Sequence, residues 1–304
     1  EDEYLRKISF DGLNKLSKVK DDYISRLETE LKVIADRGFS KYFLTMNEIA
    51  NIANEVMLTG PGRGSAAGSL VAYALDITQV DPLKYGLQFA RFLRADATDY
   101  PDIDYDVAEP MELKELLVEK WGNDVVAPIS NWNTLQLKSL IKDISKLYDI
   151  PFQEVNAVTG KMMFEATVAA KQKHGIKAGM YVPTFEEVME YSSSLQAFLS
   201  KYPHVKTHVE ALYGQVRSSS RHAGGVVIAE DLDKNMPLIN SKGVRQTPWS
   251  EGQNVRHLEP MGFIKFDLLG LSTLAMMETA IELILKRHHS IEEPTFKQVK
   301  DFYD

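Results

Sequence analysis

The stretch PDIDYDV at residues 101–107 places three aspartates at every second position between apolar residues, and this alternation predicts a β-strand. Side chains two residues apart in a strand share one face, about 6.6 Å apart along the backbone. We therefore expect Asp102, Asp104 and Asp106 on the same face. Like charges this close repel, and bound divalent cations relieve that repulsion. The stretch indicates either a metal site or a strand with a solvated acidic face.

The three aspartates are not equivalent in this interpretation. Asp102 and Asp104 are spaced to bracket two Mg²⁺ ions about 4 Å apart, the separation typical of two-metal sites. Asp106 lies roughly 13 Å from Asp102, which is too far to share that pair. We expect Asp106 to be an outer-shell or solvent-facing carboxylate.

A second acidic strand is predicted at residues 262–268, GFIKFDL, where Lys265 and Asp267 share one face. If this strand lies beside the first, Asp267 completes a site of three carboxylates. Lys265 would then stand next to the site and could meet a phosphate as a point charge.

A glycine cluster, GPGRGSAAGS at residues 60–69, precedes a predicted helix at residues 65–75. Backbone N–H groups at a helix N-terminus bind anions, and Arg63 adds positive charge, so a phosphate is the expected ligand. The cluster lacks the Gly-Lys-Ser/Thr of a P-loop but matches G-x-G-x-x-A, which leaves a dinucleotide site open. The alternative is a tight turn whose small residues pack a helix closely on a sheet.

Composition sets limits on the class of protein. The chain has 304 residues, of which 44% are hydrophobic and 26% charged, with a net charge of −8 and no cysteine. Disulfides and thiolate metal sites are thereby excluded, and a reducing cytosolic setting is the natural expectation. No run of about 18 apolar residues predicts a membrane span. Because residue 1 is Glu, we expect the chain to be part of something longer.

Periodicity predicts an α+β fold. The predicted helices cover residues 21–37, 47–57, 65–75, 113–120, 134–148, 184–199, 205–215 and 272–286, and the predicted strands cover residues 102–107, 224–229 and 262–268. Strands therefore flank a mostly helical middle. The simplest architecture is one sheet-based domain interrupted by a helical insertion.

Three long motifs resemble the catalytic region of C-family DNA polymerases, the bacterial replicative polymerase III alpha subunits. They are residues 60–107, RHAGGVVIA at residues 221–229 and FIKFDLLGLSTL at residues 263–274. The resemblance extends over about residues 23–286. It implies a polymerase-beta-like nucleotidyltransferase palm, a mixed sheet with helices, and an inserted helical thumb. The implied domains are the first part of the palm at residues 1–132, the thumb at 133–215, the second part of the palm at 216–271 and the start of the fingers at 272–304.

The resemblance also implies a role for individual residues. Asp102, Asp104 and Asp267 match the catalytic aspartates that hold two Mg²⁺ ions. Gly64, Ser65, Arg91 and Lys265 match the residues that bind the nucleotide triphosphate. Lys138 and Lys142, at the entry to the thumb, are expected to face the backbone of the primer–template DNA.

The implied function is template-directed DNA polymerase catalysis in DNA replication, with transfer of a nucleotide from dNTP to the primer 3′-hydroxyl. Expected partners are primer–template DNA, dNTP, the remaining polymerase domains, a sliding clamp and replisome proteins, but no membrane. The expected location is the bacterial cytoplasm or a phage-infected cell. The alternative is a non-catalytic DNA-binding or assembly module of a replicase. A dinucleotide-dependent enzyme is disfavoured, because it requires repeated strand–helix alternation.

The sequence departs from the family pattern in three places. Ala90 replaces the usual acid before the Arg-Phe pair, residues 156–218 match only loosely, and the chain ends at Asp304, where the fingers should begin. We therefore expect a fragment with weak or no polymerase activity by itself.

Three histidines leave other interpretations open. His204 and His208 have the i, i+4 spacing of a zinc pair on a helix, although a surface pair is favoured. His222 is expected either to pack against the sheet or to contact the primer.

Overall fold

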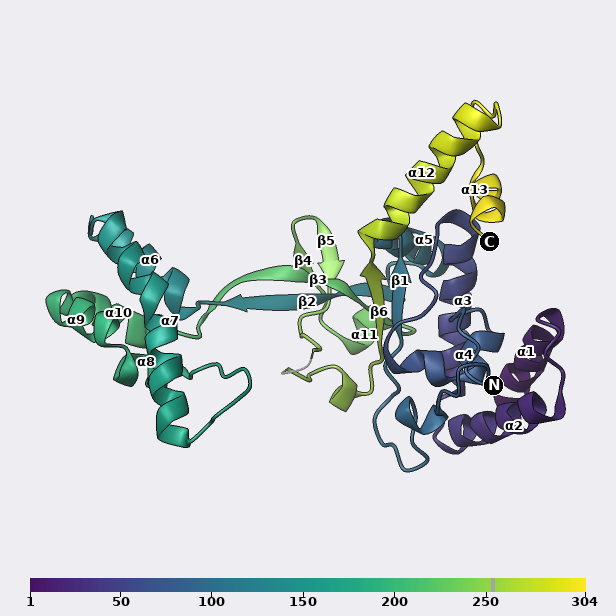
Figure 1. Ribbon diagram of the computed structural model, residues 1–304, viewed down its shortest axis with the longest axis horizontal. Helices are drawn as coiled ribbons and strands as arrows, with labels where there is room; N and C mark the ends of the chain where they lie inside the picture. Colours follow the sequence, from purple (N-terminus) through teal and green to yellow (C-terminus); the bar gives the residue numbers. More distant parts are fainter. Residues whose placement is uncertain (253–254) are drawn as a thin grey trace. The chain divides into compact units, whose positions relative to one another are not determined.

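The computed structural model describes residues 1–252 and 255–304, and it has a mixed α+β architecture with one small mixed sheet and many helices (Figure 1). The α-helices are α1 (Asp2–Lys15), α2 (Asp21–Asp36), α3 (Ser40–Val56), α4 (Leu70–Ala74), α5 (Pro110–Trp121), α6 (Leu137–Leu147), α7 (Phe152–His174), α8 (Phe185–Tyr191), α9 (Ser193–Lys201), α10 (Pro203–Leu212), α11 (Leu232–Asn235), α12 (Ser272–His288) and α13 (Phe296–Tyr303). Short 3₁₀ helices are η1 (Gly64–Gly68), η2 (Phe89–Arg91) and η3 (Glu259–Met261). The strands are β1 (Asp104–Val107), β2 (Val126–Thr134), β3 (Val216–Ile228), β4 (Ile239–Ser241), β5 (Val244–Gln246) and β6 (Lys265–Gly270).

The chain divides into two compact units. The larger unit contains residues Glu1–Asn131 and Arg221–Asp304, and the smaller contains Trp132–Ser220. The strands β2 and β3 carry the chain out of the larger unit and back into it. The smaller unit is therefore an insertion in the sequence of the larger one.

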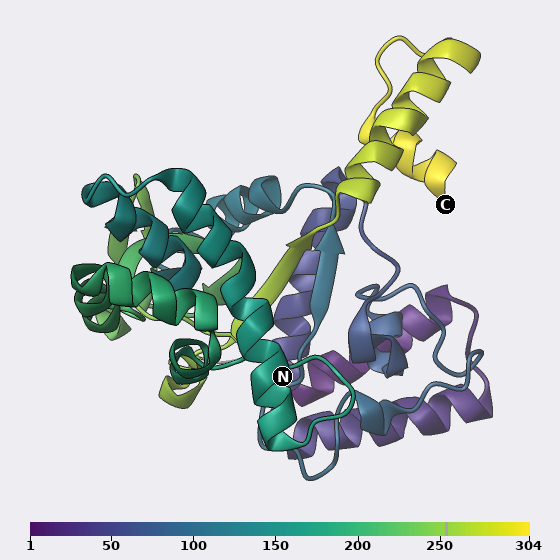
Figure 2. The ribbon, with the colours of Figure 1, turned by 60° about the vertical axis from the view of Figure 1, so that its left-hand side comes forward.

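The sheet of the larger unit has the strand order β1-β6-β3-β2. β1 and β6 are parallel, with Asp104 opposite Asp267, and β3 runs antiparallel to β6, with Gly225 opposite Asp267. Figure 2 shows β1 and β6 side by side although their sequences are far apart. β4 and β5 form a separate two-stranded sheet. Among the described residues, the strands of this sheet do not show the repeated strand–helix alternation that a dinucleotide-binding fold requires.

The N-terminal helices and one side of the sheet share a hydrophobic core. On α2, the residues Tyr23, Leu27, Leu31 and Ile34 recur at helical spacing and are all buried. Two aspartates occupy its first turn, where they interact favourably with the positive end of the helix dipole. The apolar side chains between the aspartates of residues 102–107 are also buried in this core. Burial of the apolar face leaves the carboxylates on the opposite face of the strand.

The smaller unit has its own core, built from α6 to α10. Leu140, Ile141 and Ile144 of α6 pack with apolar residues of α7, α9 and α10. The single helix predicted at residues 184–199 is wrong, because the structure has two helices there. Ser192 ends α8 and accepts a hydrogen bond from the backbone N–H of Leu195 as the N-cap of α9.

Several predicted boundaries are corrected by the structure. The strand predicted at residues 102–107 begins only at Asp104, so Asp102 lies just before β1. The helix predicted at residues 65–75 is split into η1 and α4, because Ser69 caps α4 through the backbone N–H of Ala72. The helix predicted at residues 134–148 begins only at Leu137, after β2 has ended. β2, α1, α7 and α13 were not predicted as individual elements.

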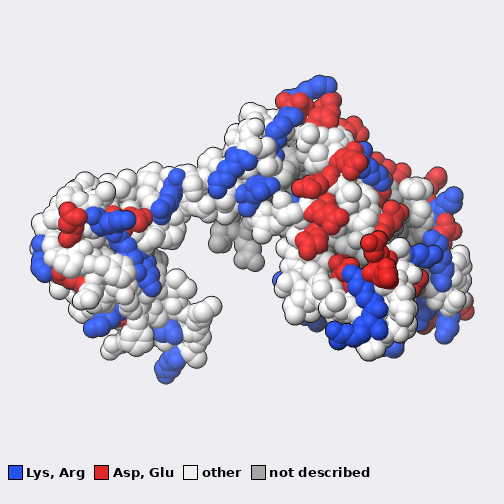
Figure 3. Space-filling model, turned by 90° about the horizontal axis from the view of Figure 1, so that it is seen from above, with Lys and Arg blue, Asp and Glu red and all other residues white. Residues whose placement is uncertain are grey.

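Charge is divided unequally between the two units. The smaller unit has ten Lys and Arg residues against eight Asp and Glu, so it carries +2 and the larger unit carries −10 of the net charge of −8. Figure 3 shows acidic side chains gathered in a broad band over the larger unit. Among the described residues, no helix is both long and apolar enough to span a membrane.

Candidate functional site

Three carboxylates converge where β1 and β6 run side by side. Asp102, Asp104 and Asp267 each offer an oxygen within 4.8 Å of the other two, and they form the one group of this kind in residues 1–252 and 255–304. Asp102 is exposed, Asp104 is half-buried and Asp267 is buried. A cluster that is open on one side and buried on the other suits an ion that must still reach a substrate.

The two oxygens of Asp267 have different surroundings. Oδ2 pairs with the ammonium of Lys265 at 2.6 Å, whereas Oδ1 is buried and has no hydrogen-bond partner among the described residues. A buried carboxylate oxygen without a partner is costly, and a cation would satisfy it. The donor set of three carboxylates fits Mg²⁺, which prefers oxygen ligands.

The electrostatic surroundings of Asp104 also favour a bound cation. Burial, followed by the neighbouring charges of Asp102 and Asp267, raises the pKa of the Asp104 carboxyl above its usual value, and Arg63 partly opposes this. Burial and repulsion by the two neighbouring carboxylates therefore disfavour the ionised form of Asp104 when no cation is bound.

Tyr42 of α3 supports the residue between the two neighbouring aspartates. Its side chain is 2% exposed, and its hydroxyl accepts a hydrogen bond of 3.1 Å from the backbone N–H of Ile103. Its ring stacks on Phe266 of β6, with centroids 5.2 Å apart. One tyrosine thus contacts both segments that carry the carboxylates, which fixes their backbones relative to each other.

The glycine cluster lies against β1. The backbone N–H of Gly60 donates to the carbonyl of Asp106 at 2.8 Å, and Thr59 forms a β-bridge with Val107. Gly64 has a φ of 61°, and a Cβ at this position would lie 3.8 Å from Oδ2 of Asp104. The turn therefore needs glycine for its conformation and runs close to the carboxylates.

The predicted anion site at a helix N-terminus is corrected in one respect. Gly64 and Ser65 begin η1, a 3₁₀ helix of five residues, rather than a long α-helix. A helix dipole of useful size is not available at Ser65, so anion binding there would depend on backbone N–H groups of the turn.

Asp106 and Arg63 form an ion pair that was not predicted. Their side chains lie 3.2 Å apart, and Nε of Arg63 is 3.9 Å from Oδ2 of Asp104. The side chain of Asp106 is only 11% exposed. Of the two alternatives for Asp106, the solvent-facing one is therefore wrong, whereas the outer-shell one stays a prediction, and Asp106 lies outside the group of three.

Arg91 is on the same unit as the three carboxylates, at the end of η2. Its side chain is exposed. η2 follows a close backbone approach, because a Cβ on Gly68 would lie 2.9 Å from the carbonyl oxygen of Gln88. The segments that carry Ser65 and Arg91 are therefore in contact.

Lys138 and Lys142 both lie on α6 of the smaller unit. Lys138 is exposed, and the ammonium of Lys142 donates to the side chain of Asn156 at 2.9 Å. The structure thus places them on a separate unit from the carboxylates.

Two further polar residues lie beside β6. Nδ1 of His222 accepts a hydrogen bond of 2.7 Å from the backbone N–H of Gly225, and burial lowers the pKa of its imidazole. Lys114 of α5 is 6% exposed and donates to the carbonyl of Ala223 at 2.8 Å. Burial lowers the pKa of the Lys114 ammonium to about 8. Both side chains hold β3 where it passes Asp267.

A pocket of about 450 Å³ opens next to the carboxylates and is lined by Asp102, Lys265, Arg256, Glu251 and Phe263, among others.

His204 and His208 lie on α10 of the smaller unit, and both contact Tyr148, whose hydroxyl is 2.7 Å from Nε2 of His208. No group of three metal-ligating side chains is found around these histidines in the described ranges.

Comparison with known proteins decides the family. A family model described as "Bacterial DNA polymerase III alpha NTPase domain" matches residues 3–270. The chain belongs to the bacterial DNA polymerase III alpha family.

Individual relatives agree with this assignment. The DNA polymerase III subunit alpha of Aquifex aeolicus is 36% identical over 94% of this chain, and the alignment covers 26% of the relative. The corresponding proteins of Campylobacter jejuni and Bacillus subtilis are 33% and 34% identical over 88% and 95% of this chain, covering 22% and 25% of their own lengths. The chain thus spans about a quarter of the length of these DNA polymerase III alpha relatives.

Sequence reasoning missed Tyr42, Lys114 and the pairing of Arg63 with Asp106. A tyrosine, a lysine or an arginine on an amphipathic segment carries no signal that distinguishes a buried, site-supporting role from an ordinary surface or core position. The pairing of Arg63 depends on the approach of the glycine turn to β1, which only the tertiary structure reveals.

Proposed function

We propose that this chain is the catalytic core of a template-directed DNA polymerase, which transfers a nucleotide from dNTP to a primer 3′-hydroxyl and releases pyrophosphate. The observation that carries the proposal is the convergence of Asp102, Asp104 and Asp267, with a buried carboxylate oxygen that lacks a partner. Membership of the DNA polymerase III alpha family supports it.

Asp102, Asp104 and Asp267 would hold two Mg²⁺ ions. Such ions, when bound, lower the pKa of the attacking hydroxyl and neutralise charge on the triphosphate. The carboxylates supply six oxygens on two adjacent backbone segments, and Tyr42 keeps those segments in register.

The nucleotide triphosphate would lie between the glycine turn and β6. Gly64 and Ser65 would offer backbone N–H groups to the phosphates, and Arg91 and Lys265 would add positive charge. Lys265 already faces the site, because its ammonium pairs with Asp267. A bound triphosphate would share this ammonium with Asp267.

The larger unit would correspond to the palm, with α12 and α13 leading into the fingers, and the smaller unit to the thumb. Lys138 and Lys142 would contact the phosphate backbone of the primer–template, which gives affinity but no sequence preference. Sequence choice would come from pairing with the template. The remaining polymerase domains, a sliding clamp and other replisome proteins would be its partners.

The experiment that tests this function is titration of the chain with dATP in the presence and absence of Mg²⁺, by isothermal calorimetry. Mg²⁺-dependent binding that disappears in Asp104→Asn supports a nucleotidyl-transfer site. A non-catalytic replicase module instead predicts DNA binding that neither Mg²⁺ nor Asp104→Asn affects, with no binding of dATP. Primer extension by the chain alone is expected to be weak or absent, and in a complete polymerase Asp104→Asn is expected to abolish it.

A further inference from the structure

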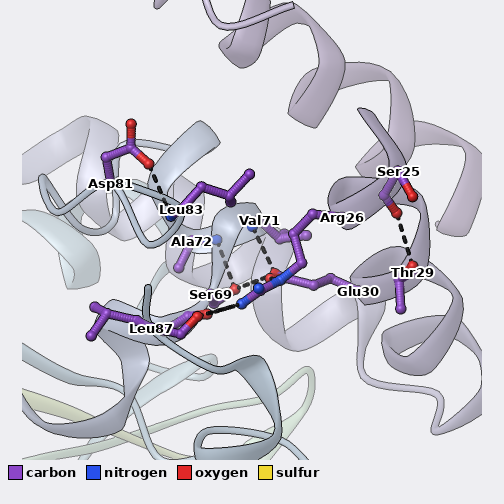
Figure 4. A network of polar contacts seen from close by, with 11 residues as sticks. Ser25, Arg26, Thr29, Glu30, Ser69, Val71, Ala72, Asp81, Leu83 and Leu87 are labelled. Atoms are coloured by element: carbon purple, nitrogen blue, oxygen red, sulfur yellow. Dashed lines mark hydrogen bonds and ion pairs between the residues drawn. The ribbon is translucent and has the colours of Figure 1, made fainter. Parts of the chain in front are cut away.

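An ion pair on α2 between the partly buried Arg26 and the buried Glu30 holds the segment that follows the glycine turn. Glu30 is fully buried, and its Oε1 accepts a hydrogen bond of 2.6 Å from Nε of Arg26, one helical turn away. Its Oε2 accepts from the hydroxyl of Ser69 at 3.0 Å and from the backbone N–H of Val71 at 3.1 Å (Figure 4). The carboxylate thus fixes the junction between η1 and α4.

Arg26 connects this junction to a second segment. Its Nη2 donates to the carbonyl of Gly68 at 2.8 Å and to the carbonyl of Leu87 at 3.1 Å (Figure 4). Gly68 ends η1, and Leu87 comes two residues before η2. One guanidinium therefore connects two backbone segments: η1, which contains Ser65, and the segment from Leu87 into η2, which contains Arg91.

The cost of this arrangement indicates a purpose other than stability. Burial raises the pKa of Glu30, against the hydrogen bonds that it accepts. Buried ion pairs add little net stability compared with apolar packing, and the best supported reason for one is that it fixes a particular geometry. The guanidinium of Arg26 suits this, because its rigid fork reaches one carboxylate and two carbonyls at once.

We infer that Arg26 and Glu30 are positioning residues that set the distance between the Gly64–Gly68 turn and Arg91, and so shape the binding site for the triphosphate. This inference rests on the proposed function. Within residues 1–252 and 255–304, the hydrogen bonds of Arg26 and Glu30 to other segments go to Gly68, Ser69, Val71 and Leu87 and not to the carboxylate cluster. They would therefore affect phosphate binding but not the binding of metal alone.

The test compares wild type with Arg26→Lys and Glu30→Gln. Lysine keeps the charge but cannot bridge the two carbonyls and the carboxylate together. Glutamine keeps the shape and an acceptor oxygen but removes the charge that holds Arg26, and it gives the same comparison should Arg26→Lys fail to fold. Arg6→Lys is the matched control, because Arg6 pairs with Glu28 on the exposed surface of α2.

Two probes separate the roles: inorganic tripolyphosphate with Mg²⁺, and Mn²⁺ alone. Both Kd values are measured well below the melting temperature, so that a change in folding does not contribute. The expected result is a rise of about tenfold in the Kd of tripolyphosphate for Arg26→Lys and Glu30→Gln, corresponding to misplacement of one phosphate contact. The Kd of Mn²⁺ is expected to stay within about twofold, and Arg6→Lys is expected to behave as wild type for both probes.

Wild-type affinity for tripolyphosphate in both variants would overturn the inference and leave the proposed function standing. A parallel loss of Mn²⁺ binding would also overturn it, because it would indicate a general disturbance of the unit. If the wild-type chain binds neither tripolyphosphate nor dATP, the proposed function fails and the inference falls with it.

Discussion

Asp104 on β1 and Asp267 on β6 are register partners in a parallel strand pair, although 162 residues separate them in the sequence. Parallel neighbours put the carboxylates at the same level of the sheet, and Asp102 joins them from the segment just before β1. Their closeness concentrates negative charge, and the resulting repulsion is unfavourable until a cation binds between the carboxylates.

Replacement of Asp267 by Asn is expected to weaken Mn²⁺ binding by about tenfold or more, since even outer-shell groups of metal sites have effects of that size. Asp106→Asn is the matched control, because it removes a carboxylate two residues from Asp104 that pairs with Arg63 instead. Calorimetric titration with Mn²⁺ measures both. Equal losses of Mn²⁺ affinity from the two substitutions would contradict the assignment of Asp267, but not Asp106, to the metal site.

Replacement of Tyr42 by Phe keeps the ring that stacks on Phe266 but removes the acceptor for the backbone N–H of Ile103. An unsatisfied buried N–H costs about 1–3 kcal/mol, so we expect a loss of stability in that range. We also expect weaker Mn²⁺ binding, because Ile103 lies between two of the carboxylates. Chemical denaturation and metal titration provide the two measurements, with the exposed Tyr4→Phe as control. Unchanged metal affinity would show that Tyr42 supports the fold alone.

Lys114 makes stability depend on pH in a specific direction. Its pKa is lowered from 10.5 to about 8, so between these values the unfolded chain binds more protons than the folded one, and stability rises with pH. Below pH 8 the charged buried lysine costs about 3 kcal/mol. Lys114→Met removes this pH dependence together with the hydrogen bond to the carbonyl of Ala223, so its stability relative to wild type should fall as the pH rises from 8 to 10.5.

Thermal unfolding at pH 7 and at higher pH tests this dependence. Lys120→Met on the same helix is the control, since that side chain is about half exposed and pairs with Glu48 at the surface. A stability difference between Lys114→Met and wild type that is constant across pH would mean that the ammonium is not desolvated.

Replacement of Gly64 by Ala should reduce stability by about 1–2 kcal/mol, the cost of a side chain in the left-handed region. Gly38→Ala is the control, because Gly38 has a φ of 73° and nothing within 4 Å of an added Cβ. Both changes should destabilise similarly, but only Gly64→Ala should weaken Mg²⁺-dependent binding of dATP. Its Cβ would stand 3.8 Å from a carboxylate oxygen of Asp104. Equal dATP affinity in the two variants would remove the glycine turn from the nucleotide site.

Local patterns predicted much of this structure. The alternation around Asp104, the acidic strand at Asp267 and the amphipathic α2 all follow from side-chain period, which depends only on which face is buried. The α+β class followed from the order of those elements. Residues 126–134 form β2 but lack a clean alternation, so their strand pairing depends on tertiary contacts.

The support around the candidate site was beyond prediction from one sequence. Arg26 and Glu30 have the i, i+4 spacing of an ordinary surface ion pair, and nothing local shows that Glu30 is buried and bonds to Ser69 and Val71. The prediction of one continuous helix after Gly64 was wrong for a similar reason. Ser69 caps a new helix there and donates a hydrogen bond to Glu30, a contact between distant parts of the sequence.

The most direct test of the central claim is anomalous diffraction from crystals of the chain soaked with Mn²⁺ and dATP. The account predicts manganese peaks bounded by Asp102, Asp104 and Asp267, with the triphosphate reaching Ser65 and Lys265. Manganese bound elsewhere, or a triphosphate that avoids the glycine turn, would contradict it.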